Sequence, residues 1–249
     1  GERAFASLPI ENIEIPTSVT TIGNYGFAEC SKLENVTYPA TITSKSSTIF
    51  EGCDMMKIIT LNGKGPMQMY SEGNQPWNSV MTQITTINIG DEVESIGMYS
   101  FKGASGITTI ELKNVETIES YAFSNSGISE ITIPNNVKTI GTNAFGYCTK
   151  LTEIVLHDEI TSIGEGIFEG CEQLGSVTIG SLIETIPTNA FKDCIVLDNF
   201  VIPTTVKTIE SKAFYNCDAL NQITIPVGVE TIGTEAFGNC ELENVTISN

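Results

Sequence analysis

Apolar residues recur along the chain with a period of 22 or 23 residues, and a similar short pattern returns in most periods. Phenylalanine marks this pattern most clearly, because the Phe residues from Phe101 to Phe237, leaving out Phe200, are 22 or 23 residues apart. Five or six residues after most of them begins a run of the form aliphatic-x-x-aliphatic-x-aliphatic, as in residues 151–156 (LTEIVL). Its last two apolar positions alternate with polar residues and are mostly β-branched. This predicts a short strand with one buried face.

A second apolar pair follows the strand in most periods. Residues 137–141 (VKTIG) are typical, and we interpret them as a second short extended segment. The segment from there through Ala-Phe-x-x-Cys is predicted to form a helical or 3₁₀ turn. Glu119 and Glu210 replace the glycine in two periods, so the backbone there does not strictly require a positive φ.

A single period is too small to bury its own apolar face, so neighbouring periods must stack on one another. We therefore expect a right-handed solenoid of mixed β-strand and α-turn repeats, 22–23 residues each, with a parallel sheet along its length. One domain of about eleven repeats would span residues 1–249. An irregular long repeat lies at about residues 62–89, where Trp77 stands in place of the usual Phe. We expect Trp77 to be the core anchor of that repeat.

The repeat is similar to a known one. Residues 128–148 read ISEITIPNNVKTIGTNAFGYC, which resembles the BspA-like leucine-rich repeat family almost position for position, and the match covers nearly the whole chain. The resemblance implies a leucine-rich repeat solenoid that is extracellular or on the cell surface of host-associated bacteria or some parasitic protists. It also implies adhesion and protein binding. The sequence begins inside a repeat and has no evident capping unit, so we expect a larger parent protein that carries the signal and the anchor.

The charge of the chain excludes some kinds of partner. There are 30 acidic and 12 basic residues, for a net charge of −18. Nucleic-acid binding requires Lys and Arg to neutralise phosphates, and anionic membranes repel such a surface. No run of 18 apolar residues occurs, so we expect no membrane insertion. The acidic residues are spread along the repeats, which favours a role in solubility.

Side chains that commonly carry chemistry follow the repeat. All seven Cys lie three residues after a repeat Phe, which indicates a small, buried packing position and seven free thiols. The single His, His157, occupies a position that is Pro or Gly in most repeats, so we expect an exposed turn residue. Its neighbours Asp158 and Glu159 are a weak signal for a cation site. We expect no enzymatic activity, no catalytic or metal-binding residues and no cofactor.

The outward positions of the predicted strands are the main candidates for partner binding. They would stack into columns of hydroxyl, amide and carboxylate groups, and solenoids commonly use such a face for partners. Val155 and Val201 are apolar at positions expected to be exposed, which indicates either contact residues or ordinary variation between repeats. The candidates on this face are Thr132, Thr178, Thr224, Glu130, Glu153, Val155 and Val201.

The long repeat supplies a second candidate region. Departures from a repeat often map to loops on a binding face, and the loop of residues 62–76 contains Met67, Met69 and Tyr70 near its tip. The sequence leaves open whether the sheet face or this loop carries binding. The expected partner is a protein or other macromolecular surface ligand. The alternative is a structural spacer rod without a ligand of its own, and a third class, a glycan hydrolase, would require a paired-carboxylate cleft that the repeat-spaced Glu residues do not specify.

Overall fold

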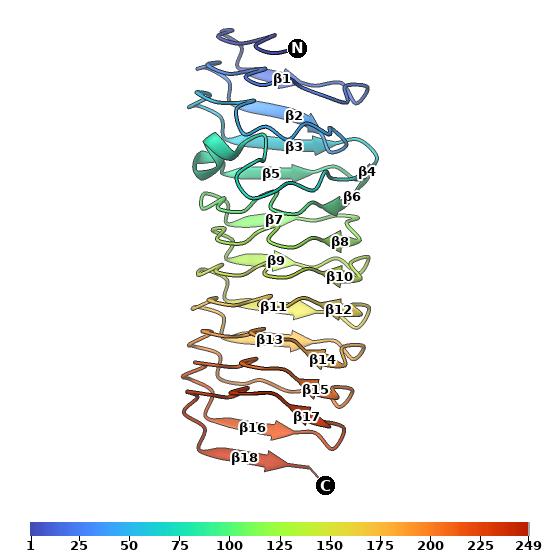
Figure 1. Ribbon diagram of the computed structural model, residues 1–249, viewed down its shortest axis with the longest axis vertical. Coiled ribbons are helices and arrows are strands. Elements are labelled where there is room, and N and C mark those ends of the chain that lie inside the picture. Colours follow the sequence, from blue (N-terminus) through green and yellow to red (C-terminus); the bar gives the residue numbers. More distant parts are fainter. Residues whose placement is uncertain (249) are drawn as a thin grey trace.

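The computed structural model describes residues 1–248; residue 249, the last of the predicted domain, lies outside the described residues. The chain forms a leucine-rich-repeat-type solenoid of about 10 turns with parallel sheets and little helix, and its termini lie at opposite ends (Figure 1). This confirms the predicted fold class.

Each turn contributes up to two strands, which stack into two rows along the long axis (Figure 1). The first strand row consists of β1 (Asn12–Glu14), β2 (Asn35–Pro39), β3 (Ile58–Asn62), β5 (Thr86–Ile89), β7 (Thr109–Glu111), β9 (Glu130–Thr132), β11 (Glu153–Leu156), β13 (Ser176–Ile179), β16 (Gln222–Ile225) and β18 (Asn244–Ile247). The second strand row consists of β4 (Gly65–Pro66), β6 (Val93–Ile96), β8 (Thr117–Ile118), β10 (Thr139–Ile140), β12 (Ser162–Ile163), β14 (Thr185–Ile186), β15 (Thr208–Ile209) and β17 (Thr231–Ile232).

Neighbouring strands pair in parallel with equivalent repeat positions opposite each other. In β11 and β13, Ile154 lies opposite Val177 and Val155 lies opposite Thr178. Because side chains alternate along a strand, Ile154 and Val177 both point into the core, and Val155 and Thr178 both point outward. The periodic sequence thus produces columns of like residues on both faces of the first strand row.

One predicted strand does not form. Residues 197–202 form no strand, and the first strand row is interrupted between β13 and β16. Phe200 occupies an inward position that is Ile or Val in most repeats. Its ring lies 5.0 Å from that of Phe191 and 4.8 Å from that of Phe214. This turn therefore uses its inward position for aromatic packing instead of a β-branched strand residue.

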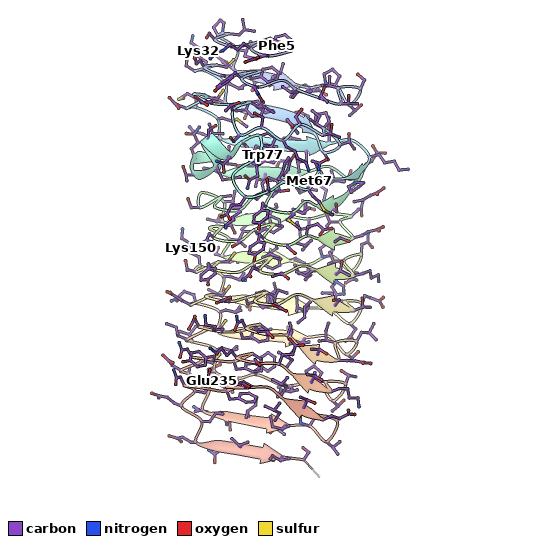
Figure 2. The ribbon with its side chains drawn as sticks, in the orientation of Figure 1. Phe5, Lys32, Met67, Trp77, Lys150 and Glu235 are labelled. Carbon is purple, nitrogen blue, oxygen red and sulfur yellow. The ribbon has the colours of Figure 1, made fainter. Side chains whose placement is uncertain are left out.

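A column of aromatic rings fills the core. Phe101, Phe123 and Phe145 stack with centroids 5.6–5.8 Å apart, and the stack continues to Phe237. Trp77 is fully buried in this column, as Figure 2 shows, which confirms it as the core anchor of the long repeat. The rings account for the strict recurrence of Phe in the sequence.

The prediction of a helical or 3₁₀ turn before each Cys is wrong. These segments form successive β-turns, such as those closed by Ala144 N–H donating to Gly141 O (3.2 Å) and Cys148 N–H donating to Phe145 O (3.2 Å). The third residues of these two turns, Asn143 and Tyr147, have φ of 48° and 61°. A positive φ at this position is typical of type II turns, and it interrupts any helix.

Helix is confined to one short element. In residues 1–248 the single helix is the 3₁₀ helix η1 (Asn78–Gln83), which lies in the long repeat (Figure 1). None of the helical structure in this part of the chain is long and apolar enough to cross a membrane.

Candidate binding surface

The outward side chains of the first strand row, with Asn199 and Val201 at the equivalent positions of the turn that lacks a strand, form a mostly polar face, called the polar face below. Thr132, Thr178 and Thr224 are all exposed on it. Thr178 lies opposite Val155, and Thr224 lies opposite Thr246 in the next strand. The structure thus places the predicted threonines in one column along the solenoid axis. Val155 and Val201 occupy the turns between them, so these three hydroxyl groups can donate and accept hydrogen bonds at intervals of about 9.6 Å, twice the spacing of adjacent strands.

Part of the polar face is tied together by its own hydrogen bonds. The Asn88 amide donates to Thr60 Oγ1 (3.1 Å), and the Asn35 amide donates to Asn12 Oδ1. Both bonds join neighbouring turns in the N-terminal part of the first strand row. Amide groups there stabilise the stacking of turns, which leaves fewer of their donors and acceptors for a partner.

The polar face carries acidic but no basic side chains. Its outward positions include Glu14, Glu111, Glu130 and Glu153, and no Lys or Arg occupies an outward position in these strands. Glu130 and Glu153, both predicted candidates, are exposed on consecutive strands β9 and β11. A partner that contacts this face meets carboxylates near the middle of the solenoid and neutral groups toward the C-terminal end.

Two valines interrupt the polar face. Val155 is 59% exposed and Val201 is 80% exposed, so both are available for apolar contact. An open groove of about 460 Å³ lies over residues 199–202, β16 and β18, lined by Val201 and Thr224 among others. A second groove of about 410 Å³ is lined by Glu111, Thr132 and their neighbours. The valines add apolar surface to the polar face, and the grooves make its shape uneven, unlike that of a uniform column of threonines.

The structure corrects the prediction for the long repeat. Met67 and Tyr70 are buried, at 4% and 3% exposure, so they do not form an exposed tip. The Tyr70 ring packs edge-on against Trp77, 6.1 Å away, and Met67 lies inside the solenoid in Figure 2. Of the three candidates in this loop, Met69 alone is substantially exposed, at 48%.

The cysteine column has a hydrogen-bonding role that the sequence did not reveal. In every turn that has a Cys, the thiol donates to the backbone carbonyl of the Phe in the preceding turn, as Cys53 does to Phe27 O (3.1 Å). All seven are free thiols, as predicted, and Cys240 alone is only half-buried. Burial raises the pKa of the Cys53 thiol to about 12 and that of Cys148 to about 11. Such thiols are protonated and inert at neutral pH.

His157 has a structural position. It is half-buried, which differs from the exposed turn residue that we expected. Its Nε2 lies 2.9 Å from Pro134 O, and its Nδ1 accepts a hydrogen bond from Glu159 N–H (3.2 Å). With Nε2 protonated and Nδ1 accepting, the ring joins two neighbouring turns. Within residues 1–248 no three His, Cys, Asp or Glu side chains gather as a metal site would require.

Comparison with known proteins identifies relatives by sequence and by fold. Residues 1–69, 79–198 and 184–249 match the family described as BspA type leucine rich repeat region. No curated protein matches the chain.

Three solved structures are similar over nearly the whole chain. A leucine rich cell surface protein from Faecalibacterium prausnitzii A2-165 is 25% identical, with a TM-score of 0.52 over 96% of this chain and 79% of its own. A leucine-rich repeat protein from Bacteroides ovatus is 23% identical, with a TM-score of 0.54 over 98% and 81%. One from Eubacterium ventriosum is 22% identical, with a TM-score of 0.51 over 94% and 83%. The last two show a shared fold.

Proposed function

Because the chain belongs to the BspA-type leucine-rich repeat family, we propose that it is an extracellular or cell-surface binding module whose polar face contacts a protein or other macromolecule. Repeats of this family generally bind without catalysing a reaction, and one similar solved structure is a cell surface protein. The observation that carries the proposal is the column of exposed hydroxyl groups at Thr132, Thr178 and Thr224. Adhesion to host or microbial surfaces is the form of binding that we infer.

The mechanism is contact at many points along the solenoid. Each turn adds two outward side chains of the first strand row, so a partner lying along the axis gains contacts turn by turn. Single exposed hydrogen bonds contribute only about 1 kcal/mol each, so useful affinity requires several turns together. Met69, exposed near the second strand row, supplies an apolar contact for a partner that extends beyond the polar face.

A stiff spacer is the second candidate, and the ring column favours it. Stacked aromatic rings join turn to turn over most of the length, which resists bending because interiors are close-packed. In that case the solenoid would project another domain from the cell and would have no ligand of its own.

A pulldown with a matched control separates the two candidates. The immobilised chain is incubated with purified extracellular-matrix proteins and mucins. The test variant carries Thr132→Gln, Thr178→Gln and Thr224→Gln, which add bulk without charge. The control carries Thr139→Gln, Thr208→Gln and Thr231→Gln in the second strand row.

The binding module predicts a partner whose retention falls about tenfold or more with the test variant, the effect of losing about 1.4 kcal/mol, and changes little with the control. If both variants lose the partner equally, the polar face is not its binding surface. No retained partner at micromolar concentration favours the spacer.

A further inference from the structure

We propose that the middle of the polar face docks a basic, extended segment of a partner protein, whose Lys or Arg side chains meet Glu111, Glu130 and Glu153. This surface, called the central face below, consists of the outward side chains of β7, β9 and β11, which are Thr109, Glu111, Glu130, Thr132, Glu153 and Val155. The inference rests on the proposed function and adds the chemistry of the partner.

The three carboxylates lie on consecutive turns. Thr109 lies opposite Glu130 and Glu111 lies opposite Thr132, so Glu111 and Glu130 are diagonal neighbours on β7 and β9. Glu153 occupies the same repeat position as Glu130, one turn further along. With adjacent strands about 4.8 Å apart, the three carboxylates fall within roughly 10 Å along the axis. All three are exposed. A segment lying along the axis can therefore reach all of them together.

No basic side chain among residues 1–248 forms an ion pair with these carboxylates, although Lys113 is close enough to Glu111 for the two charges to attract each other. The ion pairs of residues 1–248 do not include Glu111, Glu130 or Glu153. Lys113, two residues after Glu111, is paired with Asp91 at 2.9 Å. Lys138 is paired with Glu159 at 2.8 Å. Lys150 lies at the left edge of the solenoid in Figure 2, outside the strand rows.

The central face also offers apolar surface beside the charge. Val155 is 59% exposed and lies two residues after Glu153 on the same side of β11. A groove of about 410 Å³ over β7 and β9 is lined by Thr109, Glu111 and Thr132, and also by Lys113, whose ammonium group is paired with Asp91. Lys and Arg bury their aliphatic stems on apolar surface while their charged groups reach outward. A basic polypeptide satisfies both the carboxylates and the valine, which a small cation would not.

Apart from Glu14 in β1, the charged outward positions are confined to this part of the polar face. From β13 to β18 the outward positions are Ser176, Thr178, Asn199, Val201, Gln222, Thr224, Asn244 and Thr246, all without charge. The central face therefore differs from the rest of the polar face in where its carboxylates lie, which the net charge of −18 does not show. Close opposite charges across an interface fix register and speed association, so the carboxylates would position the partner and the threonines would extend the contact.

The test uses a labelled peptide of alternating Arg and Thr, ten residues long, with its ends blocked, and measures fluorescence anisotropy in 0.15 M salt. The face variant carries Glu111→Gln, Glu130→Gln and Glu153→Gln. The control variant carries Glu94→Gln, Glu116→Gln and Glu184→Gln, which are exposed and unpaired near or in the second strand row. Both variants change the net charge equally. Circular dichroism confirms that each is folded.

We expect the dissociation constant of the peptide to rise about tenfold in the face variant and less than about twofold in the control, because exposed charge pairs contribute up to about 1 kcal/mol each. Val155→Asn should weaken binding further. Equal weakening in both variants, or none in either, overturns the inference. If a partner found in the pulldown is lost with the three threonine substitutions but retained by the face variant, the proposed function stands and the basic partner is wrong.

Discussion

Trp77 stacks on Phe101 with the ring centroids 5.6 Å apart and the planes 10° from parallel. The indole Nε1–H also donates to Ser100 O at 2.6 Å. A residue that departs from the repeat in sequence thus continues the ring column and adds a hydrogen bond that Phe cannot make. This one side chain therefore joins the long repeat to the next turn by both stacking and a hydrogen bond, in addition to the pairing of β4 with β6.

Replacing Trp77 with Ala should lower the free energy of unfolding by about 3–5 kcal/mol, because it removes a large buried ring and leaves a cavity. Urea denaturation followed by far-UV circular dichroism measures this, since the substitution removes the only Trp. Trp77→Phe should cost less, because Phe keeps the stack and loses the bond to Ser100. Met69→Ala, at an exposed position of the same loop, serves as the control; a similar loss in Met69→Ala would contradict the central role of Trp77.

The seven thiols should not react in the native protein. Six are buried and all donate to a backbone carbonyl, and a protonated thiol is a poor nucleophile. Titration with a thiol reagent at pH 8 should show at most slow reaction at the half-buried Cys240, and seven thiols should react in denaturant without reductant. Rapid native reaction of several thiols would show that the Cys column opens to solvent, and fewer than seven in denaturant would indicate a disulfide.

Stability should fall at alkaline pH. Burial raises the pKa of Cys148 from 9.0 to about 11, so the unfolded chain loses this proton at lower pH than the folded one. The stabilisation is therefore complete below pH 9 and is lost as pH rises toward 11, at about 1.4 kcal/mol per pH unit for one thiol. Burial of Tyr38 and Tyr70 raises their pKa in the same direction.

The urea midpoint at pH 8 and at pH 10.5 checks this expectation. Cys148→Ala should reduce the fall in the urea midpoint between the two pH values, because it removes the titrating thiol. Ala104 occupies the same repeat position, so this site accepts an alanine. A midpoint that is unchanged between the two pH values would refute the expectation.

The stability of the protein should depend on which side chain occupies the turn positions that have a positive φ. Asn125 has a φ of 57° and is exposed. Asn125→Val should destabilise the protein by about 1–3 kcal/mol, because β-branched residues are strained at positive φ. Asn125→Gly should be close to neutral, since Gly103 already serves at the equivalent position with a φ of 80°. Thermal unfolding of both variants measures the difference, and equal effects would remove backbone strain as the cause.

Much of the fold could be predicted because its cause is periodic. The recurrence of Phe and of the aliphatic run identifies the core column and the first strand row, and the only Trp lies close enough to the Phe position to be assigned to the core. The left-handed turns could not be predicted, because residues as different as Asn143, Tyr147 and Lys212 hold the same φ region. Their conformation follows from the stacking of turns, which no local preference reveals.

The candidate surface was predictable to a similar extent. The alternation in the strands placed Thr132, Thr178 and Val155 on the exposed side, where the structure has them. The long repeat was not predictable in this way, because insertion residues have no repeat position to compare with. Tyr70 and Met67 are both buried, and the Tyr70 ring packs edge-on against Trp77.

The ring column also sets how far a local opening can spread. It runs without interruption from Trp77 to Phe237, whereas between Phe50 and Trp77 it is bridged by Tyr38, whose ring is 82° from the plane of Trp77. In a linear array, cooperativity depends on the coupling between nearest neighbours. We therefore expect the turns before the long repeat to melt as one unit and those after it as another, giving two calorimetric transitions from one continuous domain.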